Sequence, residues 1–541
     1  MLNARLNVPA PVNEPIKNYA PGSPERASLQ AALEQLGSER LEIPAVIGGE
    51  RIHTGRTGEC LVPHNHAHVL ATFHKCGEKE VNMAIDAAEK AWPAWSAMAW
   101  QDRAAIFLKA ADLLAGPWRD RINGSTMLGQ SKTVFQAEID AACELIDFWR
   151  YNVYYAEQLQ AEQPGSAPGM WNYLDHRPLE GFVFAVAPFN FSSIAGNLPT
   201  APALMGNTLL WKPSSTQMFS AWFLMQLLEE AGVPKGVINM IPGDGADVGT
   251  TAVADSRLAG IHFTGSTPTF QHLWRSIGDN IANYKSYPRL VGETGGKDFI
   301  FAHPSADVDA LVIALLRGAF EYQGQKCSAA SRAFIPASLW DTVTTGLRAQ
   351  LETVKQGDPA DFSNFMAAVI DKKSFDKIAG YIDYARNSDD HEIFFGGGCD
   401  DSVGYFIEPT VVIADQPDTK LMCEEIFGPV LALHRYEDGE LEATLDAADS
   451  ASPYALTGAI FSQDRAAIAH MSERLRFAAG NFYINDKPTG AVVGQQPFGG
   501  GRASGTNDKA GSILNLLRWV SPRTVKETFV PPKSYQYPHM S

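Results

Sequence analysis

The stretch FVFAVAPFNFSSIAGNLPTAPALMGNTLLWK, residues 182–212, decides the fold class of this chain. It begins with a short apolar run at 182–186, which is typical of a buried strand, and a helix is predicted at 194–205. A second apolar run follows at 208–211. Two buried strands joined through a helix are the building unit of a parallel sheet, so the stretch predicts an α/β fold.

The same alternation continues on the C-terminal side of this stretch. A helix is predicted at 219–231, closed by Gly232, a residue suited to the left-handed position after a helix. Strands are predicted at 237–241 and 260–263, and the pattern resumes after Lys297. We therefore predict a doubly wound sheet with both faces covered, followed by a second α/β unit.

On the N-terminal side, the spacing of apolar residues predicts helices separated by turn-forming segments. A short helix is expected at 28–36, a long helical region at 80–114 with a break near Pro93, and another helix at 140–159.

Composition and charge exclude several classes of protein. The 541 residues carry a net charge of −17, which argues against nucleic acid or anionic lipid as the main partner. No apolar stretch has the length of a membrane span. The six cysteines are far apart and have no metal-ligand spacing, so neither a disulfide scaffold nor a metal site is expected. The N-terminus resembles neither a signal nor a transit peptide, and a cytoplasmic location is predicted.

Cys327 is the first candidate for chemistry. A lone cysteine is most often a small buried apolar residue. Here it follows Gly324, Gln325 and Lys326 after a predicted helix that ends near residue 322. An irregular turn with a cationic neighbour suits an accessible thiol with a stabilised thiolate, which predicts a nucleophile.

Two further candidates follow predicted strands. Glu293 lies in the sequence GETGGK (292–297), and Asn190 lies in APFNF (187–191). Each has a simpler interpretation, a solvated turn carboxylate and a capping amide. At the end of strands in an open α/β sheet, where ligands bind, they are also suited to act as a general base and an oxyanion donor.

Six motifs in order resemble the aldehyde dehydrogenase superfamily over residues 40–520. They are PFNF (188–191), WKPSS (211–215), FTGST (263–267), ETGGK (293–297), GQKCS (324–328) and EEIFGPV (424–430). The resemblance implies that Cys327 attacks an aldehyde to form a thiohemiacetal, that Asn190 and the Cys327 N–H hold the oxyanion, and that Glu293 activates the hydrolytic water of the thioester.

The resemblance also implies NAD as cofactor, with NADP as the less preferred alternative. The sequence lacks a G-x-G-x-x-G motif after a strand. Gly265 and Ser266, before a predicted helix, would instead approach the pyrophosphate. Lys212 and Glu425 would contact the two riboses, and Ser215 stands where many NAD-selective members carry glutamate. The implied cofactor-binding residues are Lys212, Ser215, Gly265, Ser266, Glu425 and Phe427.

The loop YINDKPTGAVVGQQPFGGGRASGTN (483–507) resembles that of the Δ1-pyrroline-5-carboxylate dehydrogenase family. The resemblance implies NAD-dependent oxidation of L-glutamate γ-semialdehyde to L-glutamate, the second step of proline catabolism. The backbone N–H groups of Gly490 and Ala491, with the Ser328 hydroxyl, would hold the α-carboxylate. Some members carry serine in place of Ala491. The implied substrate-binding residues are Glu144, Phe191, Ser328, Gly490, Ala491 and Phe498.

Three alternatives remain at this point: an aldehyde dehydrogenase for another semialdehyde or an aliphatic aldehyde, a non-catalytic binding or structural protein on the same fold, and a cysteine hydrolase. No histidine accompanies Cys327 in a recognisable hydrolase motif, which disfavours the last. The presence of all three catalytic candidates, Cys327, Glu293 and Asn190, disfavours a non-catalytic protein.

The resemblance and the patterning together predict the domain organisation. The segments 164–177 and 516 onward look like pairing strands, which predicts a homodimer or a higher homo-oligomer. We expect an N-terminal arm at 1–38, an NAD-binding domain at 39–163 and 178–296, a catalytic domain at 297–500, and a small β oligomerisation flap with a C-terminal arm at 164–177 and 501–541.

Overall fold

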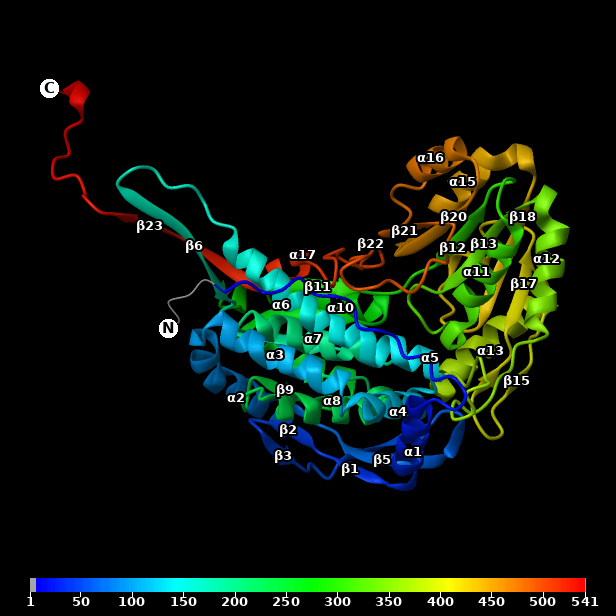
Figure 1. The fold of residues 1–541 in the computed structure, drawn as a ribbon, viewed down its shortest axis with the longest axis horizontal. Coiled ribbons are helices and arrows are strands. Elements are labelled where there is room, and N and C mark those ends of the chain that lie inside the picture. The colour runs from blue at the N-terminus through cyan, green and yellow to red at the C-terminus, as the bar shows by residue number, and fades with distance from the viewer. Residues whose placement is uncertain (1–5, 541) are drawn as a thin grey trace.

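The computed structural model describes residues 6–540 and contains two seven-stranded sheets (Figure 1). In the first sheet, β7 (Phe182–Val186) and β8 (Thr208–Lys212) are parallel neighbours, connected by α7 (Ser192–Leu204). This confirms the predicted crossover. The other strands of this sheet are β2 (Ala45–Ile47), β3 (Glu50–Ile52), β9 (Ile238–Met240), β10 (Leu258–Thr264) and β11 (Arg289–Glu293).

Both faces of the first sheet are buried. Successive side chains of a strand point to opposite faces, and along β8 Leu209 and Trp211 lie in one apolar core while Leu210 lies in another. Each face therefore needs its own layer of helices. These helices are α2 (Glu78–Ala97), α3 (Trp100–Ala115), α4 (Arg119–Gln130), α6 (Leu145–Ala161), α8 (Met218–Ala231), α9 (Gly245–Ala254) and α10 (Thr267–Asp279).

The second sheet has the strand order β14-β17-β18-β13-β12-β20-β21 and is parallel except at β14. Its strands are β12 (Asp298–Ala302), β13 (Ala330–Pro336), β14 (His391–Phe395), β17 (Thr410–Ala414), β18 (Val430–Tyr436), β20 (Thr457–Phe461) and β21 (Asn481–Ile484). Its helices are α11 (Val308–Phe320), α12 (Ala337–Leu351), α13 (Lys372–Arg386), α15 (Leu441–Ser450) and α16 (Arg465–Arg474). Shorter elements are α5 (Val134–Ala137), α14 (Lys420–Cys423), β15 (Cys399–Asp400), β16 (Phe406–Ile407), β19 (Tyr454–Ala455) and β22 (Gly501–Arg502).

Local signals missed or misplaced several elements. The three-stranded sheet of β1 (Leu41–Ile43), β4 (Thr57–Val62) and β5 (Asn65–His74) was not predicted, and β2 and β3 join the first sheet antiparallel. The break expected near Pro93 lies later, at residues 98–99, because α2 continues to Ala97 and α3 begins at Trp100. Buried Trp95 donates its indole N–H to the Ala203 carbonyl at 3.0 Å and holds the last turn of α2 in place.

Helix α6 begins later than predicted. Residues Glu138–Glu144 form a π-helical turn before α6, so the continuous apolar spacing concealed a change in helical geometry. The N-terminal helix α1 (Pro24–Ser38) is longer than the predicted 28–36.

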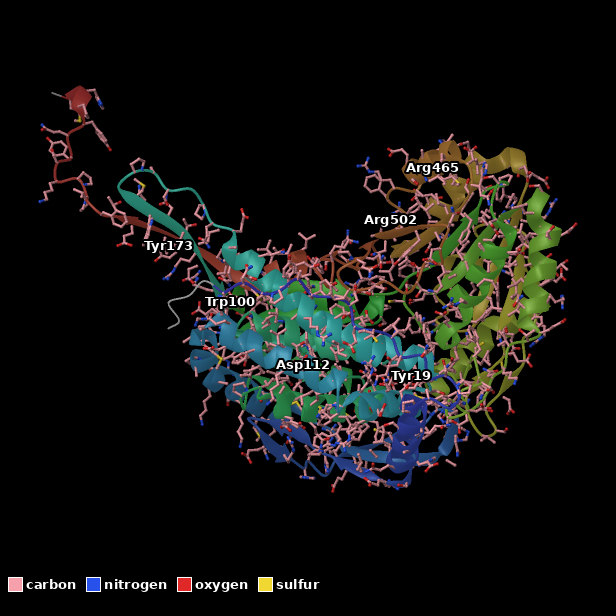
Figure 2. All side chains as sticks on the ribbon, in the orientation of Figure 1. Tyr19, Trp100, Asp112, Tyr173, Arg465 and Arg502 are labelled. Carbon is pink, nitrogen blue, oxygen red and sulfur yellow. The ribbon has the colours of Figure 1, made fainter. Side chains whose placement is uncertain are left out.

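A two-stranded ribbon projects from the body of the molecule (Figure 1). Its strands β6 (Met170–Pro178) and β23 (Val520–Thr528) pair antiparallel over their full lengths. Tyr173 lies on this ribbon (Figure 2). In the segment before β23, α17 (Ile513–Leu517) leads to Trp519, which is fully buried and packs against His262 at 4.7 Å between ring centroids.

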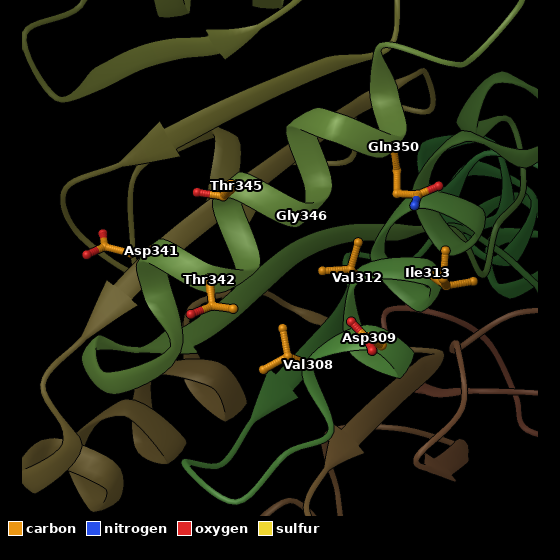
Figure 3. A pocket seen from close by; sticks show the side chains of 9 residues that line it. All are labelled: Val308, Asp309, Val312, Ile313, Asp341, Thr342, Thr345, Gly346 and Gln350. Atoms are coloured by element: carbon orange, nitrogen blue, oxygen red, sulfur yellow. The ribbon is translucent and has the colours of Figure 1, made fainter.

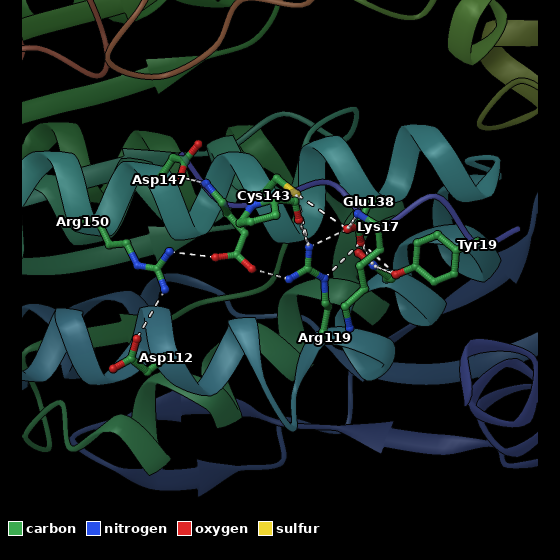
Figure 4. A network of polar contacts seen from close by, with 11 residues as sticks. Lys17, Tyr19, Asp112, Arg119, Glu138, Cys143, Asp147 and Arg150 are labelled. Carbon is green, nitrogen blue, oxygen red and sulfur yellow. Dashed lines mark hydrogen bonds and ion pairs between the residues drawn. The ribbon is translucent and has the colours of Figure 1, made fainter. Parts of the chain in front are cut away.

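The N-terminal arm is fastened to the first domain by a buried polar network (Figure 4). Arg119 forms ion pairs with Glu14 at 2.6 Å and with Glu138 at 2.5 Å, and the Tyr19 hydroxyl donates to Glu138 at 2.8 Å. The first five residues of the predicted arm and the final residue of the tail lie outside the described residues. Among residues 6–540, none of the helices combines the length and apolar character that crossing a bilayer requires.

Candidate active site

A strained turn after α11 positions Cys327. Tyr322 and Gln323 both have left-handed backbone conformations, with φ of +52° and +54°, which non-glycine residues rarely adopt. The buried Gln323 amide donates to the Ser131 carbonyl at 3.0 Å and to the Ala368 carbonyl at 2.8 Å. These bonds hold the turn in its conformation. Cys327, which is 9% exposed, lines a cavity.

Glu293, at the end of β11, lies beside the thiol. The Cys327 Sγ donates to Glu293 Oε1 at 3.5 Å. Burial raises the pKa of Glu293 to about 7, and burial together with the Glu293 charge raises the pKa of the thiol. A carboxylate that titrates near neutrality is suited to general-base catalysis.

The expected stabilisation of the thiolate by its own turn is not observed. Lys326 forms a buried ion pair with Glu321 at 3.0 Å instead of facing the thiol. The resting side chain of Cys327 is therefore a thiol, and Glu293 is the group positioned to accept its proton.

Asn190 and the backbone of Cys327 provide two hydrogen-bond donors near the sulfur. Asn190 follows β7, and its side-chain amide donates to the Gln325 carbonyl at 3.0 Å. Asn190 and Cys327 line the same cavity. Within residues 6–540, the Cys327 N–H donates to no other residue, which leaves it available to an oxyanion.

The cavity has a volume of about 710 Å³ and contains most of the predicted cofactor-binding residues. Ser215 is the exception: its neighbour Ser214 lines the wall, and Ser215 begins a short 3₁₀ turn. The predicted residues that line the cavity are Asn190, Lys212, Gly265, Ser266, Cys327, Glu425 and Phe427.

The chemistry of this wall suits a dinucleotide. Ser266 caps the N-terminus of α10, which is thereby directed at the cavity and favours a negatively charged group there. Buried Lys212 makes only a 3.4 Å contact to the Pro213 carbonyl, and burial lowers its pKa to about 8. A polar group buried with one weak partner is suited to a ligand hydroxyl.

Glu425 and Phe427 are held in place by local backbone geometry. Glu425 accepts from the Gly296 N–H at 3.1 Å. A Cβ on Gly295 would lie 2.3 Å from the carboxylate, so only glycine permits this approach. Phe427 has a φ of +61° and packs edge-on against Phe189 at 5.8 Å between ring centroids.

The predicted carboxylate-binding residues lie next to Cys327. The Ser328 hydroxyl and the Thr489 hydroxyl are 2.7 Å apart, which joins the nucleophile turn to the 483–507 loop. Gly490 has a φ of +93°. In the described chain, the N–H groups of Gly490 and Ala491 donate to no other residue. Consecutive free N–H groups in such a turn form an anion-binding concavity.

The remaining predicted substrate residues surround the carboxylate Glu293. Phe498 lines a small hollow together with Glu293. Glu144 accepts from the Ser193 hydroxyl at 2.8 Å, and burial followed by the charge of Asp140 raises its pKa to about 8. Phe191, which precedes α7, packs against the Lys132 ammonium at 4.2 Å from the ring centroid.

Sequence reasoning missed a support for Asn190. Fully buried Lys132 forms an ion pair with Asp140 at 2.5 Å, and Asp140 accepts from the Ser192 and Ser193 N–H groups at the start of α7. The pair thus anchors the segment that carries Asn190. No local signal identifies it, because lysine and aspartate are usually solvated surface residues.

A second hollow, of about 590 Å³, lies between α11 and α12 (Figure 3). Its lining includes Val312, Asp341 and Gln350, and it contains none of the predicted catalytic, cofactor or substrate residues. The Cys327 cavity, at about 710 Å³, is the larger of the two and contains the predicted chemistry.

Comparisons with known proteins agree with this geometry. The aldehyde dehydrogenase family matches residues 52–525. The Δ1-pyrroline-5-carboxylate dehydrogenase of Dictyostelium discoideum is 53% identical over 540 residues, covering 99% of this chain and 97% of its own, and the human protein is 50% identical, covering 98% and 94%. The Mycobacterium tuberculosis Δ-pyrroline-5-carboxylate dehydrogenase bound with NAD is 55% identical, with a TM-score of 0.97 and complete coverage of both chains. This chain therefore belongs to the aldehyde dehydrogenase family.

Proposed function

We propose that this protein oxidises L-glutamate γ-semialdehyde, which is in equilibrium with Δ1-pyrroline-5-carboxylate, to L-glutamate with NAD. The observation that carries the reaction is the pairing of Cys327 Sγ with Glu293 Oε1 at 3.5 Å, on the wall of a cavity that Asn190 also lines. The relatives from Dictyostelium and M. tuberculosis, named for this oxidation, support the substrate.

The cofactor site fits NAD by the chemistry of its residues. The N-terminus of α10 would hold the pyrophosphate, Lys212 the adenosine ribose and Glu425 the nicotinamide ribose. NAD, when bound, accepts the hydride that leaves the substrate carbon. Structures of the relatives from M. tuberculosis and Thermus contain NAD. The preference for NAD over NADP rests on the family resemblance. Ser215 carries no charge to repel a 2′-phosphate, so NADP stays the less preferred alternative.

The side chains perform the remaining steps. Glu293 accepts the thiol proton, and the Cys327 thiolate adds to the aldehyde carbon. The Asn190 amide and the Cys327 N–H donate to the resulting oxyanion. Loss of hydride leaves a thioester on Cys327. Glu293 releases the thiol proton to solvent and, again ionised, removes a proton from a water molecule that attacks the thioester. The thioester bond breaks, the carboxylic acid leaves, and Glu293 returns this second proton to the Cys327 thiolate.

Substrate selection is assigned to the 483–507 loop. The free N–H groups of Gly490 and Ala491 and the hydroxyl of Ser328 would bind the α-carboxylate by hydrogen bonds. This agrees with the net charge of −17, because no basic patch is required. Phe191 and Phe498 would flank the aliphatic chain, and Glu144 would lie at the entrance of the substrate tunnel.

The test is a side-by-side assay of NADH formation with L-glutamate γ-semialdehyde, succinate semialdehyde and propanal. We expect kcat/KM for glutamate semialdehyde to exceed the other two by at least tenfold, and NAD to be preferred to NADP. Equal or reversed values would favour another aldehyde as substrate. Such an outcome would leave the nucleophile and base unaffected, since the Staphylococcus aureus betaine aldehyde dehydrogenase, 26% identical, has the same fold at a TM-score of 0.84.

We also propose that the protein is a homodimer or a higher homo-oligomer, assembled through the β6–β23 ribbon. The relatives from Dictyostelium and human are named mitochondrial, so the cytoplasmic location stays a prediction for this chain.

A further inference from the structure

Three side chains far apart in sequence meet at the surface, away from the cavity of Cys327. Glu42 lies in β1, His74 ends β5, and His53 directly follows β3. These three strands lie together at the lower edge of the molecule in Figure 1. The cluster joins the three-stranded sheet, which contributes Glu42 and His74, to the edge of the first seven-stranded sheet.

The three polar atoms form a closed triangle. His74 Nε2 and Glu42 Oε1 are 2.8 Å apart, His53 Nδ1 and His74 Nε2 are 3.1 Å apart, and His53 Nδ1 and Glu42 Oε1 are 3.3 Å apart. Among residues 6–540 it is the only group of three histidine, cysteine or acidic side chains whose ligand atoms come this close.

These distances match one face of a tetrahedral metal site. Zinc binds histidine nitrogen and carboxylate oxygen at about 2.0–2.1 Å, so neighbouring ligands of a tetrahedron lie roughly 3.3 Å apart. The triangle needs to open by only a few tenths of an ångström. The three side chains already lie close to the positions that metal ligands require, so little conformational entropy is lost when an ion binds.

We propose that Glu42, His53 and His74 form a binding site for a divalent zinc-type ion, with water as the fourth ligand. Two imidazoles and one carboxylate suit zinc rather than magnesium or calcium, which prefer oxygen ligands. The side chains of Glu42 and His53 are 63% and 50% exposed, so the ion can enter and water can complete the coordination. His74 is buried and gives the site a fixed side.

The ion would displace a proton from the His74 ring, and the hydrogen bonds of the ring show which nitrogen carries that proton. The Gly55 N–H donates to His74 Nδ1 at 3.2 Å, so the ring proton of neutral His74 lies on Nε2, between Glu42 and His53. Coordination moves that proton to Nδ1, and the Gly55 amide then turns away from the ring. Gly55 lies in an exposed bend, where this movement is cheap.

The ion would act as a cross-link between two sheets. Because the three ligands come from β1, β5 and the end of β3, their fixation ties the three-stranded sheet to the first seven-stranded sheet. Binding to the folded state alone raises its stability. The site therefore has a structural role and no part in aldehyde oxidation.

The test uses Zn²⁺ and its spectroscopic substitute Co²⁺ on the full-length protein. We compare wild type with His53→Gln and Glu42→Gln, both at exposed positions where folding is retained. His470→Gln is the matched control, since His470 pairs with Glu442 on the surface and belongs to no group of three. The cysteine thiols of the protein also bind Zn²⁺. The measured quantity is therefore the difference in Zn²⁺ binding between wild type and each variant.

We expect wild type and His470→Gln to bind one more Zn²⁺ per chain in equilibrium dialysis than His53→Gln, and Glu42→Gln to bind that ion at least tenfold more weakly. Co²⁺ should give a tetrahedral visible spectrum that His53→Gln lacks, and Zn²⁺ should raise Tm in wild type more than in His53→Gln. Equal stoichiometry, affinity and Tm response in all four chains would overturn the proposal.

Discussion

At the scale of single residues, the surroundings of a side chain decide its chemistry. Cys327 and Glu293 are both buried, and burial raises the pKa of each above its usual range; for the thiol, the neighbouring Glu293 charge raises it further. Lys326, adjacent in sequence to the nucleophile, is instead paired with Glu321. Proximity in sequence therefore misled the expectation of a stabilised thiolate.

The pH dependence of turnover should follow Glu293. The carboxylate must be ionised to accept a proton, and its pKa is raised to about 7. Activity should therefore fall as pH falls below about 7, by about tenfold per unit well below the pKa, and level off above it. A kcat profile measured from pH 5 to 9 checks this. A profile that stays flat down to pH 5 would show that Glu293 is not the base.

Glu293→Gln should separate the two halves of the reaction. The neutral amide cannot activate water, so kcat should drop about 10²–10⁴-fold. Acylation should continue at a reduced rate, because the thiol must then lose its proton to solvent, while removal of the carboxylate charge lowers the pKa of the thiol. Stopped-flow absorbance should show a burst of one NADH per site followed by slow turnover. Cys327→Ala is the control and should give no burst.

Gly490→Ala should impair carboxylate recognition. At a φ of +93° an alanine is strained by about 1–2 kcal/mol, and its Cβ would lie 2.9 Å from Lys487 Nζ. We expect KM for glutamate semialdehyde to rise about tenfold, the equivalent of about 1.4 kcal/mol, with KM for propanal unchanged. Gly439→Ala, where a Cβ meets open space, is the matched control. A parallel rise in KM for both aldehydes would contradict the assignment.

At the scale of elements, the site is positioned by helix and strand ends. Asn190 follows β7, Glu293 ends β11, and Cys327 follows the turn after α11. The start of α7 has no capping side chain of its own and relies on Asp140, which its buried partner Lys132 neutralises. A buried ion pair thus replaces the usual local cap.

Lys132→Met should destabilise the protein through α7. The change leaves Asp140 charged and buried without its partner, which costs about 3–5 kcal/mol. Urea unfolding should show this loss, and kcat should fall because Asn190 shifts. The exposed pair Lys285–Glu180 provides the control, since Lys285→Met should change stability by less than about 1 kcal/mol. Equal losses in both variants would argue against an anchoring role for Lys132.

At the scale of the whole molecule, the β6–β23 ribbon projects from the body (Figure 1), and Val520 is the single buried residue of its two strands. It exposes aromatic side chains, with Trp171 62% and Phe529 54% exposed, and these two pack against each other. A two-stranded ribbon is marginally stable alone in water, which favours a partner on this surface.

The double substitution Trp171→Asp and Phe529→Asp should therefore reduce the oligomeric state. Charges on the ribbon oppose burial against another subunit. Analytical ultracentrifugation should detect a smaller species than in wild type. Tyr287→Asp, at an exposed aromatic residue elsewhere, should leave the mass unchanged. The interface lies elsewhere if the double variant keeps the wild-type mass.

The sequence by itself determined the α/β class, the crossover at 182–212 and the family. Short apolar runs that alternate with helices indicate strands buried on both faces of a sheet. The motifs around Cys327, Glu293 and Asn190 are each continuous in the sequence, so the family can be recognised without the structure. The sequence did not determine the sheet of β1, β4 and β5, because burial does not alternate regularly along β4 and β5, whose pairing is interrupted by register shifts. It also placed a helix break near Pro93, whereas α2, held by the tertiary contact of Trp95, continues to Ala97.

Only the tertiary structure decided the contacts between distant segments. The 3.5 Å pairing of Cys327 with Glu293, the Lys132–Asp140 anchor and the triangle of Glu42, His53 and His74 each join separate turns or strands. Protonation and coordination depend on burial and on atoms within a few ångströms. The distances between these atoms are set by the packing of segments that are separate in the sequence, so local sequence patterns do not reveal them.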